Sequence, residues 1–217
     1  MNIEQARFNM IEQQIRPWDV LNQGVLELLA VVKREDFVPA AHRALAFVDT
    51  EVPLPCGQCM LAPRVEARLL QELAVHKHER VLEIGAGSGY MAALLAHKAQ
   101  HVTTLEIEPE LARLASTNLR RAGVMNASVL EADGVAGLAG EAPFDVIVLS
   151  GSVAEVPPAL VAQLKPGGRL SAIVGAEPVM RAVLIGRSPD QGLERTVLFD
   201  TVAQRLRGFP EPTRFHF

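Results

Sequence analysis

The chain has 217 residues, of which 49% are hydrophobic and 21% charged, and its formal net charge is −4. This length fits one large domain or a domain with an appended arm. The acidic balance argues against nucleic-acid or anionic-membrane binding, which needs a basic surplus. Residues 1–7 lack the start of a signal peptide, no apolar run approaches the ~18 residues of a membrane span, and two cysteines make no disulfide framework. We therefore expect a cytoplasmic protein, a monomer or weak dimer, that binds neither nucleic acid nor membrane.

Two amphipathic helices and a long loop are predicted before the sheet. Residues 3–16 and 20–32 carry apolar side chains at helical spacing, with Pro17 ending the first helix and Asp19 capping the second. Residues 39–63 are rich in proline and show no sustained period, which predicts an ordered, functional loop with at most a short strand. We divide the chain into a helical arm with this loop, residues 1–63, and a ligand-binding domain, residues 64–217, packed as one compact unit.

Strands and helices alternate through most of the remaining chain. Strands are expected at 80–84, 101–105, 127–131, 144–149 and 169–174, and helices at 64–75, 88–98, 109–122 and 156–163. This alternation predicts an α/β fold of the Rossmann-like, doubly wound kind, with a mostly parallel sheet. Apolar runs at 180–187 and 194–203 flank the turn signal Pro189-Asp190-Gln191-Gly192, which predicts a closing antiparallel hairpin.

A glycine-rich turn follows the first of these strands. Gly85, Gly87 and Gly89 stand at alternate positions between a buried strand and a helix, where backbone can approach a ligand closely. Tyr90 replaces a glycine of the dinucleotide fingerprint, and the turn lacks the lysine of a phosphate-binding loop. Tight packing alone is the alternative explanation for these glycines.

Acidic residues end the next two strands. Glu106 comes 17 residues after Gly89, where a carboxylate can accept both hydroxyls of a ribose. Asp133, followed by Gly134, can accept an adenine amino group. These acids favour a nucleoside ligand that carries a positive centre.

The motifs together resemble those of a known enzyme class. Val81–Tyr90, Leu105-Glu106, Asp133-Gly134 and Leu164–Gly168 are similar to the motif series of class I S-adenosylmethionine-dependent methyltransferases. Met10–Arg16, Arg34–Pro39 and Val156–Leu160 resemble, more narrowly, the protein-L-isoaspartate O-methyltransferase family, and the similarity covers most of residues 8–187. The resemblance implies S-adenosylmethionine as cofactor, no metal, and methyl transfer to a carboxylate of damaged, isoaspartyl residues in a protein or peptide. The cofactor-binding residues implied are Glu83, Gly85, Ala86, Gly87, Ser88, Gly89, Glu106, Ile107, Asp133 and Gly134.

The substrate loop departs from the family pattern. In the family it is approximately Gly-Gln-Thr-Ile-Ser-x-Pro, and the serine hydroxyl orients the substrate carboxylate. Gly57, Gln58 and Pro63 fix the frame, in which Cys59 takes the threonine place and Leu61 the serine place. Leucine cannot donate a hydrogen bond, and an apolar side chain beside a carboxylate removes water without compensation. The resemblance places Asp49, Gln58, Cys59 and the degenerate Leu61 at the acceptor site.

Three functional hypotheses follow from this departure. The chain methylates isoaspartyl residues with Gln58, Cys59 or backbone amides as donors, or it methylates another acceptor, or it binds the cofactor without transferring methyl. Ser150 and Ser152 are further hydroxyl candidates. Cys56 and Cys59 form a C-x-x-C pair, for which an ordinary reduced pair is the main expectation and a redox or metal role the alternative.

Overall fold

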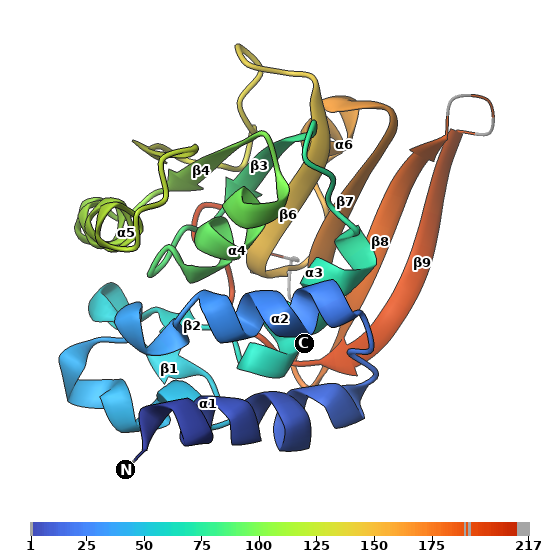
Figure 1. Cartoon of the computed structure of the whole chain (residues 1–217). Coiled ribbons are helices and arrows are strands. Elements are labelled where there is room, and N and C mark those ends of the chain that lie inside the picture. The colour runs from blue at the N-terminus through green and yellow to red at the C-terminus, as the bar shows by residue number, and fades with distance from the viewer. Residues whose placement is uncertain (1, 189, 191, 212–217) are drawn as a thin grey trace, which may run out of the picture.

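A computed structural model describes residues 2–188, 190 and 192–211. Its centre is a sheet of seven strands (Figure 1). In chain order these strands are β3 (Arg80–Ile84), β4 (His101–Glu106), β5 (Ala127–Glu131), β6 (Phe144–Val153), β7 (Leu164–Ala176), β8 (Val179–Ser188) and β9 (Gly192–Thr201). The predicted strands and the closing hairpin are confirmed, with β6 and β7 longer than expected. Pro189 and Gln191 of the predicted turn lie outside the described residues.

The strand order is β5-β4-β3-β6-β7-β8-β9. Neighbouring strands from β5 to β7 run parallel, whereas β8 pairs antiparallel with β7 and with β9. The order therefore reverses beside β3, which lies between β4 and β6. Ligands of open α/β sheets bind at such a switch point, beyond the carboxyl ends of the strands.

The central strands are buried on both faces because their apolar side chains alternate. On β3, Val81 belongs to one hydrophobic cluster, and Leu82 and Ile84 belong to the cluster on the opposite face. On β6, Val148 likewise belongs to the first cluster and Leu149 to the second. A strand that packs on both sides appears in sequence as a nearly continuous apolar run, as residues 81–84 do.

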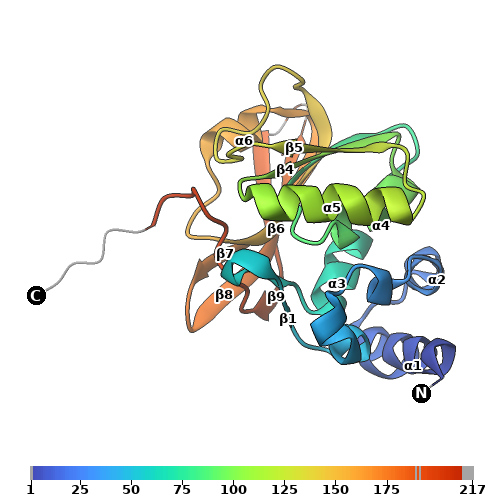
Figure 2. The same cartoon turned by 90° about the vertical axis from the view of Figure 1, so that its left-hand side faces the viewer.

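Helices cover both faces of the sheet (Figures 1 and 2). They are α1 (Ile3–Met10), α2 (Gln23–Val31), α3 (Pro63–Leu73), α4 (Tyr90–Lys98), α5 (Pro109–Arg121) and α6 (Pro158–Ala162). The first five contribute side chains to the larger cluster, and Leu160 of α6 to the smaller one. The predicted doubly wound α/β architecture with a helical arm is thus confirmed.

The two arm helices differ in detail from the prediction. After α1 the chain continues as a π-helical turn, Ile11–Ile15, and a 3-10 turn, Arg16–Trp18. Asp19 does not cap the second helix, and that prediction is wrong. Asp19 takes a left-handed conformation (φ 60°), whereas the extended Asn22 accepts a hydrogen bond from the Val25 amide at 3.2 Å and begins α2. The start is later because only an extended residue can present its side chain to the first turn.

The long loop before α3 is ordered and contains short elements. A 3-10 helix, Ala40–Phe47, is followed by β1 (Val52–Pro53), a 3-10 turn at Pro55–Gly57 and β2 (Cys59–Met60). β1 and β2 pair antiparallel as a separate two-stranded sheet. The loop thereby extends from the arm to the glycine turn.

A buried arginine joins the arm, the loop and α3. Arg34 is fully buried and donates to the carbonyls of Ala46 (3.2 Å) and Leu61 (2.9 Å), with its Nε 3.6 Å from the Glu66 carboxylate. Side chains from residues 1–63 and 64–217 share one hydrophobic cluster. The division of the chain at residue 63 stays a prediction. Within the described residues, no helix is both long and apolar enough to cross a membrane.

Replacing Arg34 should be strongly destabilising. Arg34→Met keeps most of the apolar volume but leaves the buried Glu66 carboxylate without its cation, so we expect unfolding in urea to lose about 3–5 kcal/mol of free energy. Arg43→Met, at an exposed site in the 3-10 helix Ala40–Phe47, is the matched control and should change it by less than about 0.5 kcal/mol. Equal losses in the two variants would contradict the importance of the buried pair.

Candidate functional site

The glycine turn lies where the parallel strands end. Gly85 (φ 92°) leaves β3, and its amide donates to the Leu105 carbonyl at 2.9 Å, which ties the turn to β4. Gly89 (φ 84°) precedes α4, and a Cβ there would lie 3.2 Å from the Ala115 backbone of α5. Gly89 thus serves the packing of two helices, while Gly85 and Gly87 line the main pocket.

Two acids frame this turn. The Glu106 carboxylate accepts hydrogen bonds from the Gly87 amide (2.9 Å) and the Glu108 amide (3.1 Å). Asp133 accepts one from the Val135 amide at 3.0 Å. A Cβ on Gly134 would lie 2.3 Å from Ile84, so a side chain here is excluded where β3 and the loop after β5 meet. The carboxylates are held by backbone and keep further acceptor positions for a ligand.

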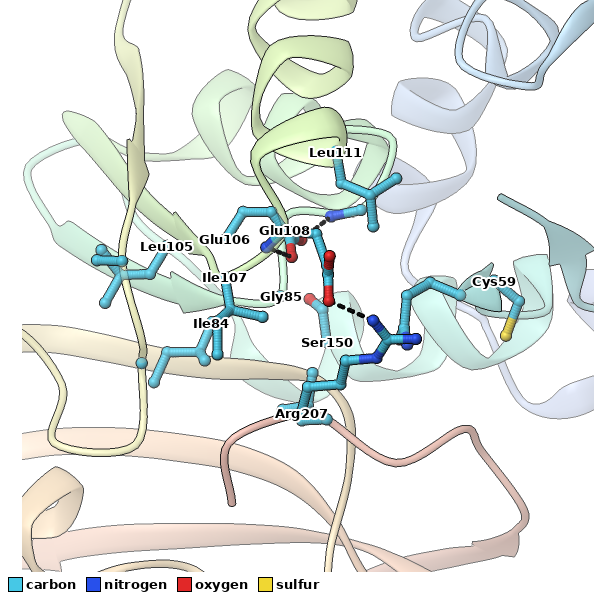
Figure 3. Close-up of a pocket in the computed structure, with 15 residues that line it drawn as sticks. Cys59, Ile84, Gly85, Leu105, Glu106, Ile107, Glu108, Leu111, Ser150 and Arg207 are labelled. Carbon is cyan, nitrogen blue, oxygen red and sulfur yellow. Dashed lines mark hydrogen bonds and ion pairs between the residues drawn. The ribbon is translucent and has the colours of Figure 1, made fainter. Parts of the chain in front are cut away.

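The main pocket joins the sheet, the substrate loop and the C-terminal segment (Figure 3). Ile107 and Gly134 line it together with Gln58 and Cys59 of the loop. A smaller cavity shares Cys59, Gly85, Gly87 and Ser150 with the main pocket. Leu61, Glu83, Ala86 and Ser88 line this second cavity. The fold therefore gathers residues that lie as far apart in the sequence as Gln58 and Arg207, 149 positions.

Glu83 is fully buried beneath the turn. One carboxylate oxygen accepts the Ser150 hydroxyl at 2.7 Å, and the other has no hydrogen-bond partner. Burial raises the pKa of Glu83 to about 7, although the hydroxyls of Ser150 and Thr104 oppose this shift. A buried acceptor without a donor is costly, which points to a donor supplied by a ligand.

Asp49 lies apart from these residues. It forms an ion pair with Arg64 at 3.0 Å, in a surface hollow of about 310 Å³ that Leu61 also borders. Leu61 is buried, and its carbonyl accepts from Arg34. The structure thus brings Gln58 and Cys59 to the main pocket, Leu61 to the second cavity, and Asp49 to neither.

Residues 204–208, which we call the strap, cross the main pocket. Leu206 packs against the turn, since its Cδ2 would lie 2.6 Å from a Cβ on Gly85. Arg207 forms an ion pair with Glu108 and donates to the Cys56 carbonyl, as Figure 3 shows in part. Gly208 lies against Asp133, whose Oδ1 would be 2.8 Å from its Cβ. Three consecutive residues therefore cover three successive strand ends.

The strap residues were not predicted as part of the site. Ser152 and the strap exchange two backbone hydrogen bonds, Ser152 N to Gln204 O (2.8 Å) and Leu206 N to Ser152 O (2.9 Å). This pairing could not be inferred, because a single isolated bridge leaves no period in the sequence.

The two cysteine thiols are free and face carboxylates. Cys59 Sγ lies 3.3 Å from Glu51, and Cys56 Sγ lies 3.5 Å from Glu110. Burial and the Glu51 charge raise the pKa of Cys59 to about 12, and burial and Glu110 also raise that of Cys56. Redox cysteines need a lowered pKa, so this environment favours unreactive thiols. Among the described residues no cluster could hold a metal ion.

Alkylation should therefore be slow in the folded protein. At pH 8 a raised pKa leaves little thiolate, and we expect Cys59 to react with iodoacetamide at least about 100-fold more slowly than in the urea-unfolded chain. Mass spectrometry of the peptides measures the rate at each cysteine. Glu51→Gln should accelerate the reaction at Cys59 and leave Cys56 as it is. Similar alkylation rates of Cys59 in folded and unfolded protein would contradict the raised pKa of this thiol.

Comparisons with known proteins agree with the geometry. Residues 5–202 match the model of the protein family "Protein-L-isoaspartate(D-aspartate) O-methyltransferase (PCMT)". The protein-L-isoaspartate O-methyltransferase of Koribacter versatilis is 41% identical over 194 residues, which cover 89% of this chain and 87% of the relative. That of Methanoculleus marisnigri is 41% identical over 169 residues, or 78% and 77% of the two chains.

Solved structures share the fold. A protein-L-isoaspartate O-methyltransferase superposes with a TM-score of 0.79 at 24% identity, over 93% of this chain and 66% of that chain. A Plasmodium falciparum protein solved in complex with S-adenosyl-L-homocysteine gives 0.78 at 21%, over 93% and 98%. The family model and the relatives at 41% identity extend over the arm, the loop and the sheet, and so this chain belongs to the protein-L-isoaspartate(D-aspartate) O-methyltransferase family.

Proposed function

We propose that this chain is an S-adenosylmethionine-dependent methyltransferase that esterifies the free carboxylate of isoaspartyl residues in proteins. The observation that carries the proposal is the family match over residues 5–202, together with a glycine turn and two acids at three successive strand ends. A cytoplasmic location, a monomer or weak dimer, and the absence of nucleic-acid binding stay predictions from the sequence.

The hydrogen-bond acceptors at the site suit the cofactor. Glu106 would accept the ribose hydroxyls, Asp133 the adenine amino group, and the unpartnered oxygen of Glu83 is an acceptor for a donor at the methionyl end. The turn carries no lysine that would repel the positively charged sulfonium. Ile107 and Leu111 supply the apolar walls of the main pocket.

The chemistry asks little of the protein beyond positioning. When bound, the cofactor supplies a methyl group on a sulfonium, and the substrate carboxylate takes it as a methyl ester while the thioether product remains. An ionised carboxylate is already a nucleophile, so no general base is needed, and the rate depends on alignment. Gln58 and Arg207 line the main pocket. They are the hydrogen-bond donors that would orient the substrate carboxylate in place of the missing serine hydroxyl. Leu61 contributes an apolar wall and no hydrogen-bond donor from its side chain.

A labelled-methyl assay tests the acceptor. We expect the wild type to methylate an isoaspartyl peptide and not the same peptide with normal aspartate. Leu61→Ser should raise kcat/KM about tenfold, because it restores a hydrogen bond to a charged group. Leu61→Ala is the control for lost bulk and should not reproduce the gain.

Two outcomes would contradict the proposal in different ways. An inactive wild type with an active Leu61→Ser variant would show that the natural acceptor is not an isoaspartyl residue. Failure of the wild type to bind S-adenosyl-L-homocysteine in calorimetry would overturn the cofactor assignment itself.

The strap should control entry of the cofactor. The main pocket encloses about 40 Å³, whereas sites for ligands of this size have about 300 Å³ or more, so the strap must move aside. Arg207→Ala removes its ties to Glu108 and the Cys56 carbonyl. We expect the association rate constant for S-adenosyl-L-homocysteine, measured by surface plasmon resonance, to rise about fivefold. Arg195→Ala, at an exposed site on β9, should leave it unchanged, and equal rates in all three proteins would exclude this role.

A further inference from the structure

The second cavity contains a carboxyl group that belongs to no cofactor motif. Glu66, on the first turn of α3, lines this space together with Glu83 and Tyr90. All three side chains are more than nine-tenths buried. Each has an oxygen without a hydrogen-bond partner, namely Glu66 Oε2, Glu83 Oε2 and the Tyr90 hydroxyl. The cavity encloses about 20 Å³, which is room for one water-sized group.

The charges around this cavity do not balance. Arg34 is the cation that faces Glu66, at 3.6 Å, and its two Nη groups are already committed to the carbonyls of Ala46 and Leu61. Glu83 is faced by two neutral hydroxyls, those of Ser150 at 2.7 Å and of Thr104 on β4. Among the described residues Glu66 therefore has Arg34 as its cation whereas Glu83 forms no ion pair, and a buried charge without a partner is costly.

The pKa values of Glu66 and Glu83 reflect this lack of cations. Burial raises the pKa of Glu66 to about 8, with Arg34 opposing the shift and the Glu83 charge adding to it. Glu83 is raised to about 7, mainly by burial as well. Both carboxyls are therefore substantially protonated at neutral pH in the empty cavity, and a positive group beside them would stabilise their ionised forms.

The position of the cavity beside the glycine turn indicates which positively charged group of a ligand would enter it. Gly85 and Gly87 line both the main pocket and the second cavity, so a ligand along the turn can extend from one into the other. The apolar side chains of Leu61 and Met91 form other parts of the wall. A primary ammonium is water-sized, carries one positive charge and has three donors.

We propose that Glu66, together with Glu83, binds the primary ammonium at the methionyl end of the cofactor. This inference rests on the proposed function, and it adds Glu66 to the residues of the cofactor site. It gives Glu66 two partners, Arg34 on one side and the ammonium on the other. Leu61 then has a role of its own, since an apolar wall keeps water away from this charged contact.

Calorimetry with two ligands tests the proposal. S-adenosyl-L-homocysteine has the ammonium, whereas methylthioadenosine lacks the whole amino-acid end. Glu66→Gln keeps the shape of the side chain and removes its charge. We expect Glu66→Gln to weaken the binding of S-adenosyl-L-homocysteine about tenfold, which corresponds to the loss of one charge-assisted hydrogen bond. The affinity for methylthioadenosine should change less than about twofold.

Glu35 supplies the matched control. It is another buried carboxyl paired with an arginine, Arg7, but it does not line the cavity. Glu35→Gln should cost stability without altering the ratio of the two affinities. If Glu66→Gln and Glu35→Gln give the same ratio as the wild type, Glu66 is only the counter-ion of Arg34 and the inference is overturned.

Further measurements keep the test decisive if Glu66→Gln does not fold. Glu66→Asp retains the charge and should keep a ratio closer to that of the wild type. The wild type alone should bind S-adenosyl-L-homocysteine more than about tenfold more tightly than its deaminated analogue, and equal affinities would overturn the inference. Failure of the wild type to bind either adenosine ligand would instead overturn the proposed function.

Discussion

The burial of Arg34 is the constraint on which the rest of the site depends. Its guanidinium meets the carbonyls of Ala46 and Leu61, lies 3.6 Å from Glu66, and stands 5.8 Å from the Tyr90 ring centre. One side chain thereby fixes the arm, the substrate loop, α3 and the start of α4. Since a buried guanidinium needs all of its partners, these elements have little freedom to move independently. This explains why Arg34–Pro39, far from the cofactor motifs, is part of the family pattern.

The parallel sheet supplies the second constraint. β3, β4 and β5 end at the same edge, so Gly85, Glu106 and Asp133 are neighbours although 48 residues separate the first from the last. The backbone then fixes the acids, because the Gly87 amide reaches the Glu106 carboxylate at 2.9 Å. Preorganised acceptors of this kind do not need to reorient when a ligand arrives. The sheet and the glycine turn therefore form a rigid floor, and the loop and the strap form the walls above it.

The substrate side is where this chain differs from the family pattern. Leu61 stands where the family resemblance predicts a serine, and Glu66, five residues later on α3, brings a carboxyl into the cavity that Leu61 also lines. The C-x-x-C pair, for which a redox role was open, consists of two thiols held next to carboxylates. The polar side chains that line the two cavities thus include acids, Arg207 of the strap and the Ser150 hydroxyl.

The sequence by itself determined the alternation of strands and helices, the glycine turn and the acids at the strand ends. It could do so because buried strands, positive-φ turns and helix starts are local and leave periodic or compositional signals. It misplaced the cap of α2, since Asp19 and Asn22 are both acceptable caps and only the backbone angle distinguishes them. The tertiary structure alone decided that Asp49 lies apart from the pocket, that residues 204–208 cross it, and that Glu66 faces Glu83. Each of these depends on contacts between segments distant in the chain, where packing, and not local pattern, sets which side chains meet.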